Sequence, residues 1–325
     1  MLLEKKAVRP FNRHQAALFS AHAAGNYQMA LNIALAAHRE CPADHARTWY
    51  WQACAYSLLG NTEKALAALH AGLAEGVWFS PRMLDTDTDL DAVRGTRQFT
   101  GIREECDRLR KARQAAARPE CIVLAPASAI WEQQTLLLLH QWGQSARSFM
   151  EHWRPLVDEG WTLVAAQSSQ PCDSTGFCWD DHDLARQEIR QHLDDCWRKR
   201  GIAPESMIIA GASQGARLAL ESAHEAGVPW LCVIPSFPTG YDVTSLTAVP
   251  LHTRGAFLLG QHDPANGRTR PVIASLISAG ALVEERTMTG IGHELPDDFV
   301  VQAGKMLAGL QNRDAMGRKG FTVPG

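Results

Sequence analysis

The sequence predicts two parts of different class: a small all-α region over residues 1–117, and an α/β region over 118–310 in which helices flank a mostly parallel sheet. The N-terminal third is rich in alanine and contains almost no strand pattern. From about residue 118, short apolar runs alternate with helical segments, as is typical of strands buried on both faces of a sheet. A length of 325 residues also suggests two folding units. The polar residues 311–325 are expected to form a flexible tail.

A short repeat organises the N-terminal region. The pattern G-N-x-x-x-A-L occurs at Gly25 and again at Gly60, an offset of 35 residues (60 − 25). This offset is close to the period of about 34 residues found in tetratricopeptide repeats. Residues 10–75 therefore resemble a helical-hairpin repeat of the tetratricopeptide type. Residues 85–100 are predicted to form a capping turn or short helix, and 102–117 a charged connecting helix.

Two repeats are fewer than the roughly three that a stable solenoid usually needs. We therefore expect the helical region to dock on the α/β region, on another protein or on a second copy of the chain as a homodimer. Two interpretations of its purpose stay open. It either gates access of a partner or substrate, or it stabilises the chain without a functional role of its own.

The α/β region opens with a strongly apolar run at 135–139, which predicts a buried strand. It leads into His140, Gln141, Trp142 and Gly143. A second strand is predicted at 161–166. The residues that follow, 168–181, are a loop by composition.

The next strand leads into the most informative motif of the chain. The apolar run 207–210 predicts a buried strand, and a G-x-S-x-G pattern centred on Ser213 follows it. A helical pattern continues beyond the motif and stops at Gly227 and Pro229. A serine between a strand and a helix in this pattern is typical of a nucleophile elbow, although a tight turn with a surface serine is the plainer interpretation.

Two later strands end in residues that complete a catalytic set. Asp263 follows the strand predicted at 255–260, and His293 follows the strand predicted at 281–286, before a helix expected from about residue 297. Sites in open α/β sheets lie at the carboxyl ends of strands. The chain order Ser, Asp, His is that of enzymes whose serine nucleophile stands on such an elbow. Asp263 alone is also a plausible turn residue, His293 alone a solvent-exposed loop residue, and His262 an alternative functional group.

The three residues predict a division of labour for acyl transfer. Ser213 is the nucleophile, His293 its base, and Asp263 the carboxylate that orients the imidazole. The developing oxyanion needs two backbone N–H donors. The N–H of Gln214 is one, and the N–H of Trp142 or Gln141 is the candidate second.

With these motifs in place, residues 120–310 resemble the α/β-hydrolase superfamily. They are most similar to its phospholipase/carboxylesterase branch, with dienelactone-hydrolase-like enzymes as near relatives. The resemblance implies serine esterase chemistry on esters, thioesters or acylated proteins, without a cofactor. The family usually has glycine after the strand-end histidine, where this chain has Gln141. That difference bears on the second oxyanion donor.

The resemblance also implies an acyl pocket walled by the loops after the strands. The residues expected there are His140, Phe177, Trp179 and Phe237, with Trp142 and Tyr241 nearby. The alternative is that these aromatic side chains only pack the loops onto the core.

Composition limits the classes of partner and of site that we expect. With 32 Lys+Arg against 35 Asp+Glu, the net charge is −3, which does not favour nucleic acid or a membrane surface. The 8 cysteines lack zinc-site spacing, so no metal is expected; Cys172 and Cys178 are near enough in sequence to pair, but no secretory signal is evident. No apolar run of about 18 residues predicts a membrane span. These features predict a cytoplasmic protein.

The sequence therefore predicts a serine esterase that cleaves carboxylic esters through an acyl-enzyme on Ser213. A thioesterase or a peptidase of the same fold is the runner-up. The rival from another class is an interaction protein built on a catalytically impaired hydrolase scaffold, a hypothesis that Gln141 favours.

Overall fold

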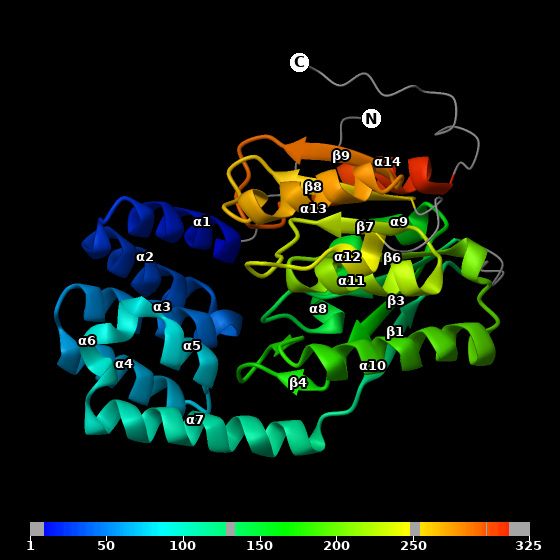
Figure 1. Cartoon of the computed structure of the whole chain (residues 1–325). Coiled ribbons are helices and arrows are strands. Elements are labelled where there is room, and N and C mark those ends of the chain that lie inside the picture. The colour runs from blue at the N-terminus through cyan, green and yellow to red at the C-terminus, as the bar shows by residue number, and fades with distance from the viewer. Residues whose placement is uncertain (1–9, 128–133, 248–253, 297, 312–325) are drawn as a thin grey trace. The chain divides into compact units, whose positions relative to one another are not determined.

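The structure, a computed structural model, describes residues 10–127, 134–247, 254–296 and 298–311. It divides into two compact units, shown in Figure 1. The helical unit comprises residues up to Ala117 together with Pro171–Gly176. The α/β unit comprises Arg118–Gln170 and the residues from Phe177 onward. The tail expected at 311–325 lies outside the described residues except for Gln311.

In its described residues the helical unit contains seven α-helices, as expected for an all-α region. The first four follow one another as neighbours in space, each packed against the next. A hydrophobic core forms around Leu69, Phe79 and Ile102. The helices are α1 Pro10–Ala23, α2 Tyr27–Glu40, α3 His45–Leu58, α4 Thr62–Ala74, α5 Pro81–Thr86, α6 Asp91–Arg94 and α7 Arg97–Ala116. The last begins five residues before the connecting helix predicted from residue 102.

The sequence repeat corresponds to the same turn built twice. Gly25 and Gly60 adopt φ angles of 69° and 74°, a left-handed conformation that favours glycine. In each case the following asparagine caps the next helix: the Asn26 side chain accepts a hydrogen bond from the N–H of Met29, and the Asn61 side chain one from the N–H of Lys64. The repeat therefore encodes where α2 and α4 begin.

Segment 171–176 belongs to the helical unit although it comes from the middle of the α/β sequence. The Ser174 N–H donates to the Trp78 carbonyl at 3.1 Å, and Arg113 donates to the Asp173 carbonyl at 2.6 Å. The Asp173 carboxylate accepts from the N–H groups of Thr175 and Gly176, which closes the segment into a compact turn.

A seven-stranded sheet forms the centre of the α/β unit. Its strand order is β1-β3-β2-β6-β7-β8-β9, and every neighbouring pair is parallel except β1 with β3. The strands are β1 Glu120–Leu124, β2 Thr135–Leu139, β3 Thr162–Gln167, β6 Met207–Ala212, β7 Trp230–Val233, β8 Arg254–Gly260 and β9 Leu282–Met288. A separate small hairpin pairs β4 Gln170–Pro171 with β5 Phe177–Cys178.

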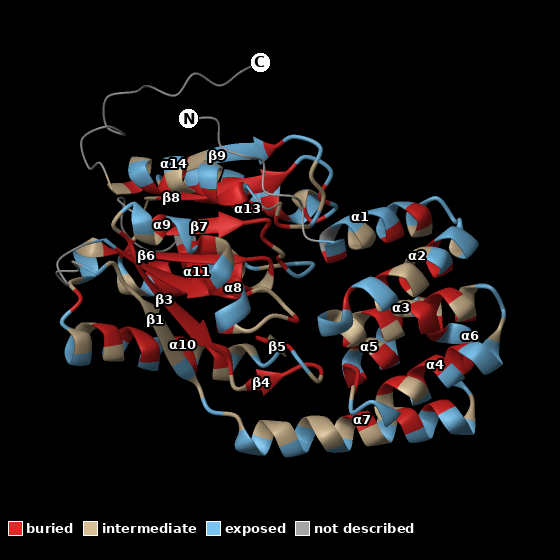
Figure 2. Ribbon diagram, turned by 180° about the vertical axis from the view of Figure 1, so that it is seen from behind, coloured by how far each residue is buried: buried red, intermediate tan, exposed pale blue. Residues whose placement is uncertain are grey.

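Helices cover both faces of this sheet, and the inner strands are buried except at Arg254, the first residue of β8 (Figure 2). One core layer joins alternate strand residues to α10 His182–Asp194, α11 Gln214–Ala226 and α13 Asn266–Ser278. The other joins the intervening residues to α8 Ala146–Trp153, α9 Pro155–Asp158 and α14 Phe299–Gln311. The short α12 Thr244–Thr247 follows β7. This is the predicted α/β class with a mostly parallel sheet.

Two findings concern the cysteines and the membrane. All eight cysteines are free thiols, Cys172 and Cys178 included. None of the described helices is long and apolar enough to cross a membrane.

Candidate active site

Ser213 stands at the junction of β6 and α11, in a conformation that L-residues seldom adopt. Its φ is 52° and its ψ is −115°. Such strain persists only where the surroundings hold it. Here the Ser213 N–H donates to the Val233 carbonyl at 3.0 Å, and the Ser213 carbonyl accepts from the N–H groups of Ala216 and Ser236. The turn thus presents the serine hydroxyl at the carboxyl end of a central strand.

Both glycines of the G-x-S-x-G motif are sterically required. A Cβ on Gly211 would lie 2.2 Å from the carbonyl oxygen of Gly215. A Cβ on Gly215 would lie 2.3 Å from the carbonyl oxygen of Leu139, at the end of β2. The motif therefore encodes close backbone contacts that allow the strained serine to sit between strand and helix.

The three predicted catalytic residues meet in one hydrogen-bonded chain. Ser213 Oγ lies 2.8 Å from His293 Nε2, and His293 Nδ1 lies 2.7 Å from Asp263 Oδ2. The Asp263 side chain is 1% exposed and that of His293 is 35% exposed. A buried carboxylate on Nδ1 keeps the proton on that nitrogen and leaves Nε2 free to accept the serine proton. His262, the alternative to Asp263, is exposed.

The loops that carry Asp263 and His293 are joined to each other. The His262 N–H donates to the Ile291 carbonyl at 2.8 Å, and the Gly290 N–H donates to the Gln261 side chain at 2.7 Å. The second carboxylate oxygen of Asp263 accepts from the Ala265 N–H at 2.8 Å. These bonds fix the carboxylate and the imidazole relative to each other.

The loop after β2 contains the candidate second oxyanion donor. The Gly143 N–H is committed to the Phe177 carbonyl at 2.9 Å. In the described part of the chain, no hydrogen bond engages the N–H of Gln141 or of Trp142, so both are available as donors. Gln214 begins α11, where the first N–H groups of a helix have no partner within the helix.

The side chain of Gln214 has a role that the sequence did not indicate. Its Oε1 accepts from the Trp179 N–H at 2.8 Å, and its Nε2 donates to Asp180 at 2.9 Å. The residue after Ser213 therefore also holds the loop that follows β5. Sequence spacing contains no signal for this contact because 35 residues separate Gln214 from Trp179.

The structure places three of the side chains expected in the aromatic cleft in the core. His140 and Trp179 are 0% exposed and Phe237 is 1% exposed, so these three side chains belong to the core. The His140 ring stacks on Trp179, whose indole N–H donates to the His140 carbonyl, and Phe237 packs against Tyr241. Among the four predicted pocket residues, only Phe177 is partly exposed. Tight packing of the loops onto the sheet, the alternative interpretation, accounts for the other three.

Side chains that could hold a metal ion gather elsewhere in the described residues. Two groups of three metal-binding side chains converge, and both lie in the helical unit: His38 with His45 and Glu75, and Cys54 with Asp87 and Asp89. The triad is in neither group.

Comparison with known proteins agrees with this architecture. A family model described as A/B hydrolase-like, N-terminal domain, matches residues 15–116. A crystal structure of an uncharacterized protein from Bacillus cereus ATCC 10987 aligns over 93% of this chain and 99% of its own, with a TM-score of 0.52 and 19% identity. Esterase PE8 aligns over 59% of this chain and 99% of its own, with a TM-score of 0.53 and 19% identity. No curated protein sequence matches the chain.

These likenesses, at 19% identity, concern the fold. Three observations indicate the same fold: the sheet order, the elbow at Ser213 and the matched N-terminal region. The chain therefore has the α/β-hydrolase fold, preceded by a helical domain that matches the A/B hydrolase-like N-terminal family.

Proposed function

We propose that the chain is a serine hydrolase that cleaves carboxylic esters through an acyl-enzyme on Ser213. The observation that carries the proposal is the continuous chain from Ser213 Oγ to His293 to Asp263, with distances of 2.8 and 2.7 Å. Nucleophile, base and orienting carboxylate within such distances are the arrangement that acyl transfer requires.

The mechanism follows from this geometry. His293 Nε2 takes the proton of Ser213 as Oγ attacks the ester carbonyl carbon, and the oxyanion forms near the N–H groups of Gln214 and Trp142. His293 then gives that proton to the departing alkoxide, which leaves as the alcohol. Water, deprotonated by His293, attacks the acyl-serine, and collapse of the second tetrahedral intermediate releases the acid and restores Ser213. Asp263 supports the imidazolium in both halves.

Esters are the favoured substrate class because of the name of one structural neighbour, esterase PE8. Thioesters and peptides pass through the same tetrahedral intermediates. Parallel assays with p-nitrophenyl esters, acyl thioesters and peptide anilides distinguish these classes.

Active-site labelling tests the nucleophile directly. A fluorophosphonate probe is expected to label the wild-type protein at Ser213 and to leave Ser213→Ala unlabelled. The same variant is expected to lose p-nitrophenyl acetate hydrolysis by about 10⁴-fold or more, as measured by kcat/KM. Ser275→Ala is the matched control, because Ser275 lies partly exposed on α13 and its hydroxyl donates to the Pro271 carbonyl. Equal labelling of wild type and Ser213→Ala would disprove the assignment.

A further inference from the structure

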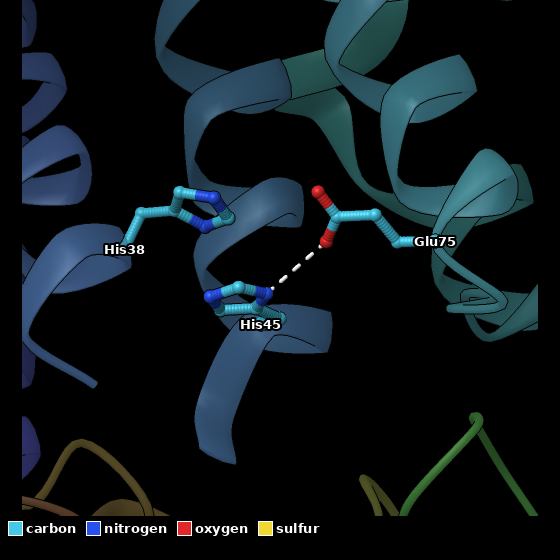
Figure 3. A group of neighbouring side chains, drawn as sticks. All are labelled: His38, His45 and Glu75. Carbon is cyan, nitrogen blue, oxygen red and sulfur yellow. Dashed lines mark hydrogen bonds and ion pairs between the residues drawn. The ribbon is translucent and has the colours of Figure 1, made fainter. Parts of the chain in front are cut away.

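Three metal-binding side chains meet in the helical unit, and the proposed hydrolysis uses none of them. His38 lies in the last turn of α2, His45 is the first residue of α3, and Glu75 directly follows α4. Figure 3 shows the two imidazole rings beside each other, with the Glu75 carboxylate directed toward them from the end of α4. Three helix ends thus contribute one side chain each, and Glu75 comes 30 residues after His45.

Their distances are close to those of a metal site. One ligand atom from each residue lies within 4.8 Å of the others, and His45 Nδ1 lies 3.1 Å from Glu75 Oε2. Ligands bound tetrahedrally to zinc at about 2.0–2.1 Å are roughly 3.3 Å apart, so one pair is already near that spacing. The other ligand pairs lie within 4.8 Å and must come closer to reach that spacing.

Hydrogen bonds prepare His38 as a ligand. The Thr48 hydroxyl lies 2.9 Å from His38 Nδ1 and 3.3 Å from the His45 carbonyl, which can only accept. When the hydroxyl proton goes to that carbonyl, Thr48 accepts from His38 Nδ1–H, and the His38 lone pair is on Nε2. Metal-ligating histidines almost always donate their other N–H in this way, which fixes both tautomer and ring orientation.

Glu75 is held in a comparable way. The Trp49 indole N–H donates to Glu75 Oε2 at 3.0 Å, and the Trp49 ring also lies 4.3 Å from that of His38, centroid to centroid. Trp49 therefore supports the carboxylate and one imidazole together. The site is open to water, since the side chains of His45 and Glu75 are 29% and 43% exposed.

We propose that His38, His45 and Glu75 bind one divalent transition-metal ion, for which zinc is the natural probe. Two imidazoles and one carboxylate form a ligand set that zinc sites use, with water in the fourth position. The ion would connect the ends of α2, α3 and α4. The two imidazole rings stack with 22° between their planes and centroids 4.1 Å apart, so one must turn for both lone pairs to meet the ion. We expect His45 to turn, because it is partly exposed.

Direct zinc titration of the full chain tests the site. Protein treated with a chelator and dialysed is titrated with zinc chloride by calorimetry, and thermal melts are recorded with and without zinc. One equivalent should bind and raise the melting temperature. His38→Gln, His45→Gln and Glu75→Gln should each weaken binding at least about ten-fold, and Thr48→Val, which frees the His38 tautomer, by about 10- to 100-fold.

Two control variants separate this site from other zinc binding. His14→Gln removes a histidine–carboxylate pair on the same unit, that of His14 with Glu40 at 2.8 Å, and should leave zinc binding unchanged. Cys54→Ser disrupts the second convergent group and should do the same. No zinc binding by the wild type, or equal binding by His38→Gln and His45→Gln, overturns the proposal.

Cobalt provides a readout that does not depend on how well the variants fold. Cobalt(II) bound by imidazole and carboxylate in the wild-type chain should show ligand-field bands without a thiolate-to-cobalt charge-transfer band. A thiolate band would place the ion at a cysteine such as Cys54 and would contradict the assignment to His38, His45 and Glu75.

Discussion

Burial decides the protonation state of His140, the residue that follows β2. Its Nδ1–H donates to the Gln141 carbonyl at 3.0 Å, its Nε2 accepts from the Ser168 N–H at 3.5 Å, and its ring stacks on Trp179. The surroundings thus satisfy a neutral imidazole, and the residue is 0% exposed. Desolvation lowers the pKa of His140 to about 4.

The pKa of His140 predicts a loss of stability in acid. In the unfolded chain this histidine titrates near 6.5, so between pH 6.5 and 4 the unfolded state binds the proton and the folded state does not. The free energy of unfolding should therefore fall as the pH drops through this window, and the His140 contribution amounts to about 3 kcal/mol at most. Urea unfolding of the wild type at pH 7, 6 and 5 measures the slope.

A variant assigns that slope to His140. The amide of His140→Gln can donate to the Gln141 carbonyl and accept from Ser168, but it does not titrate. We expect His140→Gln to be less stable than wild type at pH 7 and to lose less stability on acidification. His70→Gln, at an exposed position of α4, is the control and should keep the wild-type slope. A wild-type slope in His140→Gln would contradict the assignment.

Single residues of the candidate site were predictable to different degrees. Ser213, Asp263 and His293 could be identified because each follows a strand, and the parallel sheet brings those strand ends to one edge. Phe237 could not be placed, because an aromatic residue in a loop has the same sequence signal whether it lines a cleft or packs in the core. Burial, which decides between the two, depends on contacts that are distant in sequence.

Helix starts are the element-scale feature that the sequence encodes most directly. Asn26 and Asn61 occupy equivalent caps, each 3.1 Å from the backbone N–H three residues later. Replacement of either by alanine should cost about 1 kcal/mol of unfolding free energy, because an N–H at the helix start loses its partner. Chemical denaturation measures this, and serine at the same position should restore most of the loss.

Asn32→Ala is the matched control for the two caps. Asn32 is exposed in the interior of α2, where alanine is the better helix former, so this change should be neutral or slightly stabilising. If Asn26→Ala and Asn32→Ala had the same effect, the cap would contribute nothing beyond intrinsic helix propensity.

The strands differ in how clearly the sequence predicts them. The sequence predicted β2, β3, β6, β8 and β9 within two residues at either end, because apolar runs or bounding glycines mark them. β7 has only four residues, and β1 is partly exposed along its length, so neither shows a clear period. The strands of the β4–β5 hairpin have two residues each, too few for any periodic pattern.

At the scale of the whole molecule, the order of segments along the chain does not fully predict which unit each segment belongs to. The change from helical to strand pattern near residue 118 coincides with the boundary after Ala117. Segment 171–176, in contrast, belongs to the helical unit although it lies between two elements of the α/β unit. Long-range hydrogen bonds, such as that from Ser174 to Trp78, place the segment in the helical unit, and no local sequence pattern predicts these bonds.

This arrangement predicts what deletion of residues 1–117 would do. The shortened chain keeps the triad but lacks Trp78 and Arg113, which bond the backbone of Ser174 and Asp173. Segment 171–176 then loses those protein partners, and its backbone should open. Limited digestion with a non-specific protease, mapped by mass spectrometry, should cut the shortened chain within 171–176 much faster than the full chain. Arg113→Ala in the full chain removes one of the two bonds and should give an intermediate rate. Equal protection of this segment in the shortened and full chains would show that the α/β unit orders it without the helical unit.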